Sequence, residues 1–286
     1  VLDINRARNW EEFRAALGRL PGPALNFVYA DAAGNIGYQA VGRLPLRKGY
    51  DGSLPADGAS GEFDWRGVMP FDKLPSTFNP PGGMIVSANQ DPFPAGSPDR
   101  APGYYAPPYR FRQIRDRLRA KAQWNAAEML SIQMDIYSGF AHFLAREILA
   151  AYERRGSSYP ALAEAVRQLK GWNGQMSASD AAPMIVGLAY RHLRAALARR
   201  VSKTGQPVYT IAAAAAVVER LLRERPPDWF RDYDQLLLDN LSEALEEGRR
   251  MQGRDVRKWE YGRLNRLEIV KFCPTERKRT LHREVK

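Results

Sequence analysis

The sequence predicts an α+β fold, with a β-rich first part and a helical second part. From about residue 24 to residue 108 the chain is rich in glycine and proline and contains short apolar runs of β-prone residues. From about Tyr109 to Gly262, apolar residues recur at helical spacing between breaks that contain glycine and proline. Strands followed by a run of helices, rather than strands that alternate with helices, are typical of the α+β class.

The composition is that of a globular protein. The chain has 286 residues, of which 44% are hydrophobic and 26% are charged. It can therefore bury a substantial core, and it does not belong to the disordered class. The length is compatible with one or two domains.

Several kinds of site are excluded or disfavoured. No apolar run approaches the ~18 residues of a membrane-spanning helix, so no membrane partner is expected. Cys273 is the single cysteine, which excludes an internal disulfide and a cysteine metal cluster. His142, His192 and His282 lie far apart in sequence, and none has a metal-type partner four residues away. This pattern argues against a histidine metal site.

The net charge of +11 leaves more than one kind of anionic partner open. Most arginines are spread along helical segments, and a dense basic stretch occurs only in the tail. Its basic residues are Lys271, Arg277, Lys278, Arg279, Arg283 and Lys286. This distribution favours a solvated basic surface over a nucleic-acid site. A basic pocket for substrates that carry a carboxylate also fits the charge, which does not single it out.

The first expected element is a short amphipathic helix that ends at about Leu20. Trp10, Phe13 and Leu17 recur at spacings of three and four residues, as the buried stripe of a helix does. The Pro-Gly-Pro sequence at residues 21–23 ends this helix, because proline cannot continue the hydrogen-bond ladder.

A β-hairpin is expected next. LNFVYA at residues 25–30 and IGYQAVG at residues 36–42 are β-prone runs. The DAAGN sequence between them is a turn, in which Asp31 can bond its own backbone and Gly34 or Asn35 can adopt a positive φ. The long proline- and glycine-rich loop that follows contains aromatic anchors, among them Tyr50 and Trp65. MIVSAN at residues 84–89 is predicted to be a second buried strand.

Six helices are expected in the second part. Their predicted ranges are residues 110–121, 126–154, 160–169, 179–200, 211–223 and 233–250. The breaks between them include RRGSSYP, GWNGQ, KTGQP and ERPPDW, which contain the residues that end helices.

Three polar residues of the β part are candidates for a function. Asp31 and Asn35 lie in the hairpin turn, where a structural role is the more common one. Asn89 lies at the end of an apolar strand, and a buried amide at a strand end must find hydrogen-bond partners. From the residues alone, Asn89 either caps a loop or points its NH2 group into a pocket.

A longer series of motifs adds to this interpretation. It begins with N-x-x-Y-A-D-x-x-G-N-I-G-Y at residues 26–38, continues with WRG at residues 65–67 and PF at residues 70–71, and reaches SAN at residues 87–89. Later members are Tyr109, Arg110, Ile114, Gln133, Asp135, Trp172, Asp228, Trp229, Trp259 and Gly262. In this order, over about residues 10–267, the motifs resemble the β-chain of the penicillin acylases, the penicillin amidase family of N-terminal nucleophile hydrolases.

The resemblance implies an amidohydrolase. In this family an N-terminal serine attacks the amide carbonyl, and its own α-amino group acts as the base. Since Val1 stands first here, we expect the serine to lie upstream and this chain to be an internal fragment of the precursor, or zymogen, inactive on its own. The implied substrates are N-acyl compounds, either β-lactam antibiotics, with a role in antibiotic biosynthesis, or N-acyl homoserine lactones.

The resemblance also assigns site residues. Asn89 occupies the position of an asparagine whose amide donates a hydrogen bond to the oxyanion. Arg110 matches an arginine that helps to hold the site, and its planar fork could orient Asn89 or bind a substrate carboxylate. Many family members bind a structural calcium ion, for which Asp99 is the nearest candidate ligand.

The family fold has four αββα layers, with two stacked antiparallel sheets between helices. We expect residues 1–108 to be part of this catalytic core, residues 109–268 to form a mainly helical lobe, and residues 269–286 to be a divergent basic tail. The expected partners are a small N-acyl amide substrate and the remainder of the precursor, namely the α-chain and the N-terminal part of the β-chain. The resemblance implies a periplasmic or secreted enzyme. Without the upstream strands the sheets would have open edges, so we expect the isolated chain to aggregate.

Some residues depart from the family pattern. Asn173 stands in GWNG where relatives have an aspartate, and Tyr261 and Asn265 stand where relatives often have a tryptophan and a histidine. From about Ile269 the tail no longer resembles the family. A rival hypothesis, supported by the net charge and the basic tail, is a noncatalytic basic binding protein on a degenerate acylase scaffold, which would bind nucleic acid or another acidic partner.

Overall fold

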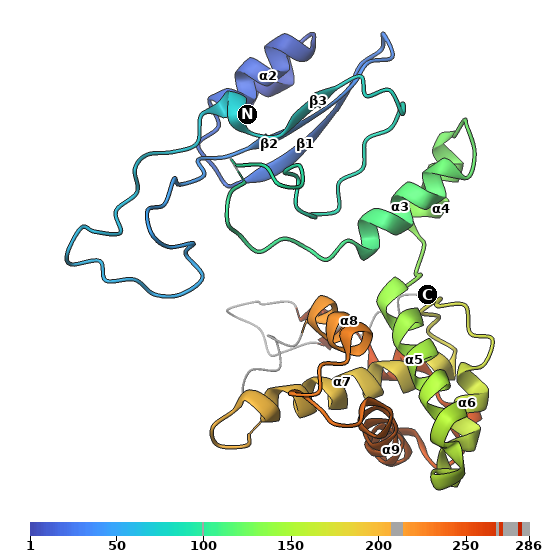
Figure 1. The fold of residues 1–286 in the computed structure, drawn as a ribbon. Coiled ribbons are helices and arrows are strands. Elements are labelled where there is room, and N and C mark those ends of the chain that lie inside the picture. Colours follow the sequence, from blue (N-terminus) through green and yellow to red (C-terminus); the bar gives the residue numbers. More distant parts are fainter. Residues whose placement is uncertain (99, 207–213, 267–268, 271–279, 282–286) are drawn as a thin grey trace. The chain divides into compact units, whose positions relative to one another are not determined.

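The computed structural model describes residues 1–98, 100–206, 214–266, 269–270 and 280–281. The chain divides into two compact units, Val1–Trp124 (unit 1) and Asn125–Lys286 (unit 2). Unit 1 contains a three-stranded sheet and unit 2 is mainly helical, so the predicted α+β class is confirmed (Figure 1). The sequence places the start of the helical lobe at residue 109, whereas the helix that begins there belongs to unit 1.

The elements of unit 1 include the helix and the hairpin expected from the sequence. They are α1 (Leu2–Arg6), α2 (Trp10–Gly18), β1 (Leu25–Ala30), β2 (Ile36–Val41), η1 (Phe71–Lys73), β3 (Ser76–Phe78) and α3 (Tyr109–Arg119). The predicted amphipathic helix and both strands of the predicted hairpin are therefore confirmed.

One face of the sheet is covered by α2 (Figure 1). The strand order is β1-β2-β3 with antiparallel pairing, and Val28 lies opposite Tyr38. Trp10 of α2 stacks on Phe78 with 5.3 Å between ring centroids. Trp10 also lies directly over Gly37, where a β-carbon would be only 2.4 Å from its ring. The aromatic stripe predicted for this helix therefore packs on the sheet.

The other face of the sheet is packed against the loops that follow it. Ala40 forms a buried cluster with Met69, Leu74, Phe93 and Ala101. The cluster joins β2 to the segment between residues 69 and 101, and so holds the loop around residue 89 beside the sheet.

The strand predicted at residues 84–89 is wrong. Residues 84–88 pair with no described strand, and the third strand of the sheet is instead β3. The side chain of Gln90 supplies the reason, because it bonds to backbone groups of Val86 and Ala88 that a neighbouring strand would otherwise use.

Unit 2 is built mainly from seven helices within its described residues. They are α4 (Ala126–Gln133), α5 (Gly139–Arg155), α6 (Ala163–Leu169), α7 (Ala181–Val201), α8 (Ala215–Glu224), α9 (Tyr233–Gln252) and α10 (Tyr261–Leu264). Three short 3-10 turns, η2 (Gly156–Ser158), η3 (Pro160–Leu162) and η5 (Val256–Lys258), connect them. The described tail residues include the strand pair β4 (Ile269–Val270) and β5 (Thr280–Leu281).

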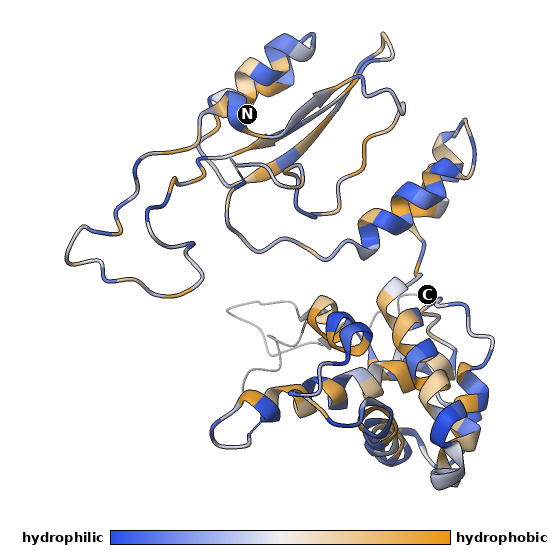
Figure 2. Cartoon of the chain, in the orientation of Figure 1, coloured by the Kyte–Doolittle hydropathy of each residue, from blue (hydrophilic) through white to orange (hydrophobic). Residues whose placement is uncertain are grey.

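The core of unit 2 lies between α5, α7 and α9. Leu144 of α5, Leu188 of α7, and Leu238 of α9 are completely buried, and Figure 2 shows hydrophobic residues along these helices. Trp259 is also buried and lies against Gly248 of α9, where a β-carbon would be 2.3 Å from the indole ring.

The single helix predicted over residues 126–154 is wrong, because the structure has two helices with a break at residues 134–138. In the break, Tyr137 donates its backbone N–H to the Asp135 carboxylate at 3.1 Å and forms a β-bridge with Gln175. Ser138 then caps α5 by accepting a hydrogen bond from the N–H of Ala141. Side-chain bonds to the backbone therefore replace the helical ladder.

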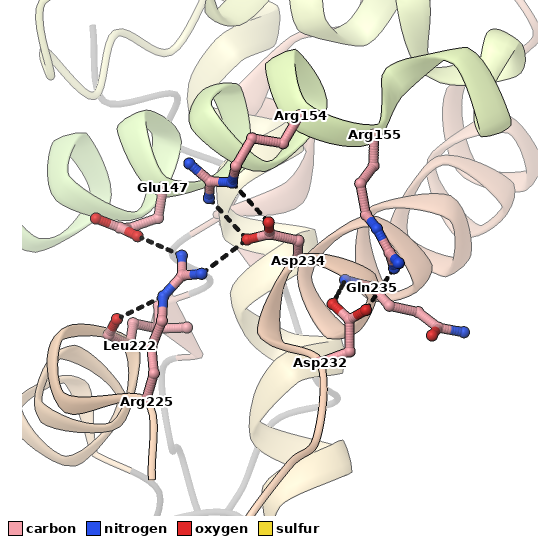
Figure 3. A network of polar contacts seen from close by, with 8 residues as sticks. All are labelled: Glu147, Arg154, Arg155, Leu222, Arg225, Asp232, Asp234 and Gln235. Carbon is pink, nitrogen blue, oxygen red and sulfur yellow. Dashed lines mark hydrogen bonds and ion pairs between the residues drawn. The ribbon is translucent and has the colours of Figure 1, made fainter. Parts of the chain in front are cut away.

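An ion-pair network joins α5, the end of α8 and the start of α9 (Figure 3). Asp234 accepts hydrogen bonds from Arg154 at 2.6 and 2.7 Å and from Arg225 at 2.9 Å. Arg225 also reaches Glu147 at 3.3 Å. The hydrogen bonds from Arg154, with the one from Arg225, lower the pKa of Asp234 to about 2.

Candidate active site

The candidate site is the turn that presents Asn89 in unit 1. Asn89 has a φ of 63°, in the left-handed region that asparagine tolerates better than most residues. Its carbonyl oxygen accepts a hydrogen bond of 2.7 Å from the N–H of Ala106. The preceding residue, Ala88, is buried, whereas Asn89 itself is exposed. The backbone is therefore anchored while the side chain remains accessible within unit 1.

Arg110 reaches this turn from the first turn of α3. Its Nη2 atom donates to the carbonyl oxygen of Ala88 at 2.9 Å and to Oδ1 of Asn89 at 3.1 Å. Proline at residues 107 and 108 precedes the helix and directs the chain into it. The structure thus brings together Asn89 and Arg110, the two residues that the resemblance assigns to one site.

The contact with Arg110 determines which way the amide of Asn89 points. A guanidinium group only donates hydrogen bonds, so the atom that faces Arg110 must be the amide oxygen. The NH2 group then faces away from Arg110, and no hydrogen bond to another described residue engages it. This arrangement presents an N–H donor to any group that approaches the turn. The positively charged guanidinium group of Arg110, which bonds to the amide oxygen, polarises this donor.

A second ion pair lies next to the turn. Arg100 donates to the Asp91 carboxylate at 2.5 Å, and this hydrogen bond raises the pKa of Arg100. Burial raises the pKa of the nearby Tyr105, whose hydroxyl donates to the carbonyl oxygen of Ala101 at 2.7 Å. These contacts tie Arg100 to Asp91 and Tyr105 to Ala101, and no carboxylate of the described residues bonds to the Asn89 amide group.

Unit 1 has no imidazole that could activate a nucleophile. Its sequence contains no histidine, since the three histidines of the chain are residues 142, 192 and 282. The described residues around Asn89 therefore offer an amide N–H donor and a guanidinium group, without an imidazole from the same unit.

The polar residues of the hairpin turn bond to one another, which agrees with the structural role that their position in the sequence favours. Asp31 accepts hydrogen bonds from the backbone and side chain of Asn35 at 2.9 and 2.8 Å and from the hydroxyl of Tyr29 at 2.9 Å. The hydrogen bonds from Asn35 lower the pKa of Asp31. Asn79 bonds to Asn35 at 2.8 Å, which ties β3 to the turn.

Several of the later motif residues lie in unit 2 and make contacts within it. Asp135 accepts from Gln175 at 3.1 Å, and Trp172 donates its indole N–H to the carbonyl oxygen of Gln175 at 2.9 Å. The carbonyl oxygens of Asp228 and Trp229 accept from Arg200. These contacts close loops within the helical unit.

The calcium expectation finds no support in the described residues. Asp99, its candidate ligand, lies outside them. Within the part of the chain that the structure describes, no group of three or more acidic, histidine or cysteine residues could hold a metal ion. The same part contains no helix with the length and apolar character that crossing a bilayer requires.

Sequence reasoning missed Gln90 and Ala106, which also hold the Asn89 turn. Their contacts use backbone groups and a side chain that reaches back over its own turn. Neither gives a periodic signal. The only available hint was a polar residue directly after Asn89 at the end of an apolar run.

Comparisons with known proteins identify the family of the chain. The family model described as penicillin amidase matches residues 1–281. Penicillin acylase 2 proenzyme of Pseudomonas sp. (strain SE83) is 37% identical over 194 residues, which are 68% of this chain and 24% of that protein. Acyl-homoserine lactone acylase QuiP of Pseudomonas fluorescens (strain Pf0-1) is 28% identical over 93% of this chain and 35% of that protein.

A solved structure shows the same fold. A thermostable penicillin G acylase from Alcaligenes faecalis superposes with a TM-score of 0.68 and 21% sequence identity, over 90% of this chain and 52% of that one. The chain spans 24% and 35% of the length of the two relatives above.

Proposed function

The chain belongs to the penicillin amidase family, and from this premise we propose that it forms part of an amidohydrolase that cleaves the linear amide bond of N-acyl compounds. The observation that supports the proposal most strongly is the Asn89 turn. Its amide oxygen is held by Arg110 at 3.1 Å, and its NH2 group is left without a described partner.

In the proposed reaction, a serine hydroxyl attacks the amide carbonyl and the carbonyl oxygen becomes negatively charged. The NH2 group of Asn89 donates a hydrogen bond to that oxygen. Arg110 and Ala106 hold the turn in advance, so little reorganisation is needed when the charge develops. The α-amino group of the serine takes the hydroxyl proton and passes it to the leaving nitrogen, so that collapse of the tetrahedral intermediate expels a neutral amine, and water then hydrolyses the acyl-enzyme.

We further propose that the nucleophile is an N-terminal serine carried by a part of the enzyme outside these 286 residues. The sequence resemblance is the basis of this step, and two findings are compatible with it. The relatives are several times longer than the region they share with this chain, and one of them is named a proenzyme. The partners of this chain would then be the remainder of the precursor and a small-molecule amide.

The proposed substrates are N-acyl amines. The relatives are named for penicillin and for acyl-homoserine lactones, both of which contain an acyl group on an exocyclic nitrogen. The resemblance also supports a periplasmic or secreted enzyme, which fractionation of cells that express the complete gene would test.

The proposal is tested by assaying amide hydrolysis with and without the rest of the precursor. The substrate is an N-acyl anilide whose cleavage releases a coloured amine. We expect no turnover above background from these 286 residues alone, and turnover from the complete gene product. Turnover by the chain alone would contradict an external nucleophile. A complete, folded gene product that cleaves neither penicillins nor acyl-homoserine lactones nor anilides would contradict the amidohydrolase proposal.

A further inference from the structure

The side chain of Gln90 forms hydrogen bonds with the turn that presents Asn89. Its Oε1 atom accepts a hydrogen bond of 2.8 Å from the N–H of Ala88, and its Nε2 atom donates to the carbonyl oxygen of Val86 at 3.4 Å. One side-chain amide therefore bonds to the backbone on the N-terminal side of Asn89 at two points. Gln90 is partly buried, so water competes less for these bonds than it would at an exposed position.

With the hydrogen bond from Gln90, both backbone polar groups of Ala88 are bonded. The N–H of this residue bonds to Gln90, and its carbonyl oxygen bonds to Arg110 at 2.9 Å. Asn89 follows with a φ of 63° and with its own carbonyl oxygen bonded to Ala106. Contacts such as these stabilise the left-handed conformation, which costs asparagine less than most residues other than glycine. Of the residues whose side chains hold this turn, Gln90 is the nearest to Asn89 in sequence.

We propose that Gln90 is a positioning residue for the Asn89 amide during amide hydrolysis. This inference rests on the proposed function, since it assumes that the Asn89 NH2 group stabilises the oxyanion. Gln90 acts through the backbone of Ala88, and its own amide is occupied on both sides. It fixes the direction in which the Asn89 donor points before the charge develops.

Two variants of the complete enzyme disrupt the hydrogen bonds of the Gln90 side chain. Gln90→Met keeps the length of the side chain and removes both hydrogen bonds. Gln90→Asn keeps the amide chemistry, and is one methylene too short to reach both backbone groups. We expect both to lower kcat about tenfold with little change in KM, because the substrate still binds while the donor is misdirected. Gln123→Met, at an exposed position in the same unit, is the matched control and should leave kcat unchanged.

A double-mutant cycle separates positioning from a general structural role. In an Asn89→Gly background, Gln90→Met should change kcat by less than about twofold, because the donor that Gln90 directs is already absent. A second readout does not depend on activity. Amide hydrogen exchange at Ala88 should accelerate about fivefold to tenfold in Gln90→Met and stay unchanged in Gln123→Met.

The outcomes distinguish this inference from the function on which it rests. If Asn89→Gly lowers kcat and Gln90→Met does not, or if Gln90→Met costs the same factor in both backgrounds, the positioning role is overturned. If Asn89→Gly itself keeps the full kcat, the oxyanion assignment in the proposed function fails. Loss with Gln90→Met that vanishes in the Asn89→Gly background, together with faster exchange at Ala88, would support the proposal.

Discussion

At position 89, the backbone and the side chain are held by different parts of unit 1. Ala106 bonds the carbonyl oxygen, and Arg110 of α3 bonds the amide oxygen. The remaining NH2 group is the part of the residue that acts on the substrate in the proposed reaction. The chemistry proposed here therefore depends on one donor whose direction is set by its neighbours.

Two substitutions at Asn89 separate the amide from the backbone conformation. Asn89→Gly removes the donor and suits the φ of 63°, whereas Asn89→Ala removes the donor and adds left-handed strain of about 1–2 kcal/mol. In the complete enzyme both should lower kcat by about 10²- to 10³-fold, the usual effect of losing one oxyanion donor. Steady-state kinetics on folded protein would check this. A near-normal kcat in Asn89→Gly, with a loss only in Asn89→Ala, would show that the turn matters and the amide does not.

The sequence predicted this residue site in part. The motif order identified Asn89 and Arg110, because each matches a position in the family, and the structure places them in contact. It did not identify Gln90 or Ala106. Bonds from a side chain to its own turn, and between two loop backbones, depend on local φ and ψ angles that no spacing of residue types encodes. The role of Asn89 in catalysis remains a prediction.

Among the elements of unit 2, α9 depends on a close approach that only glycine permits. Gly248→Ala would place a β-carbon 2.3 Å from the buried Trp259 ring, so we expect the free energy of unfolding to fall by about 1–3 kcal/mol. Gly187→Ala on α7 is the matched control, since its nearest neighbours lie at 3.8 Å. The control should be neutral, or stabilise by up to about 1 kcal/mol through helix propensity. Urea unfolding of both variants would test this, and equal effects would contradict the packing described for Trp259.

The start of α9 should be sensitive to acid. The folded-state pKa of Asp234 is about 2, below its ordinary value of 3.8. Its contribution to stability is therefore complete above about pH 4 and is lost as the pH falls toward 2. From the size of the shift, the contribution is about 2 kcal/mol, and the side chain is only 14% exposed.

Asp234→Asn tests this contribution. At pH 7 it should lower the free energy of unfolding by about 2 kcal/mol, and it should flatten the loss of stability between about pH 4 and pH 2. Asp228→Asn changes an exposed carboxylate nearby and should do neither. Equal acid sensitivity in the parent chain and Asp234→Asn would show that protonation of Asp234 does not contribute to acid unfolding.

Most helices were predictable because their apolar stripes and their breaks are both local signals. Two predicted elements, the helix over residues 126–154 and the strand at residues 84–89, were wrong. The apolar periodicity continues through residues 134–138, but Asp135 and Ser138 bond to the backbone there and end the ladder. The apolar run at residues 84–88 looks like a strand, but two of its backbone groups, the N–H of Ala88 and the carbonyl oxygen of Val86, bond to Gln90. In both places a polar side chain competes with secondary structure, which periodicity does not weigh.

At the scale of the whole molecule, the sheet of unit 1 has an open edge. Within the described residues β1 pairs on one side only, with β2, and its Val28 is 57% exposed. An unpaired edge with an exposed apolar side chain favours edge-to-edge association. This feature agrees with the expectation that the isolated chain aggregates.

A charge on that edge should reduce self-association. Val28→Lys should increase the monomer fraction of the isolated chain in sedimentation velocity, because lysine disfavours pairing of exposed strands. Val217→Lys, at a 42% exposed position on α8, adds the same charge away from the sheet and should have little effect. An equal gain from both variants would mean that net charge, and not the strand edge, controls solubility.

The most direct test of the central claim is to find the reactive serine of the complete enzyme. The enzyme is treated with a serine-directed sulfonyl fluoride until amide hydrolysis stops, and the modified peptide is identified by mass spectrometry. We predict that the label is on an N-terminal serine outside these 286 residues, and that no residue of this chain is modified in proportion to the loss of activity. A stoichiometric label on a serine within the chain, such as Ser87 beside the Asn89 turn, would contradict the account.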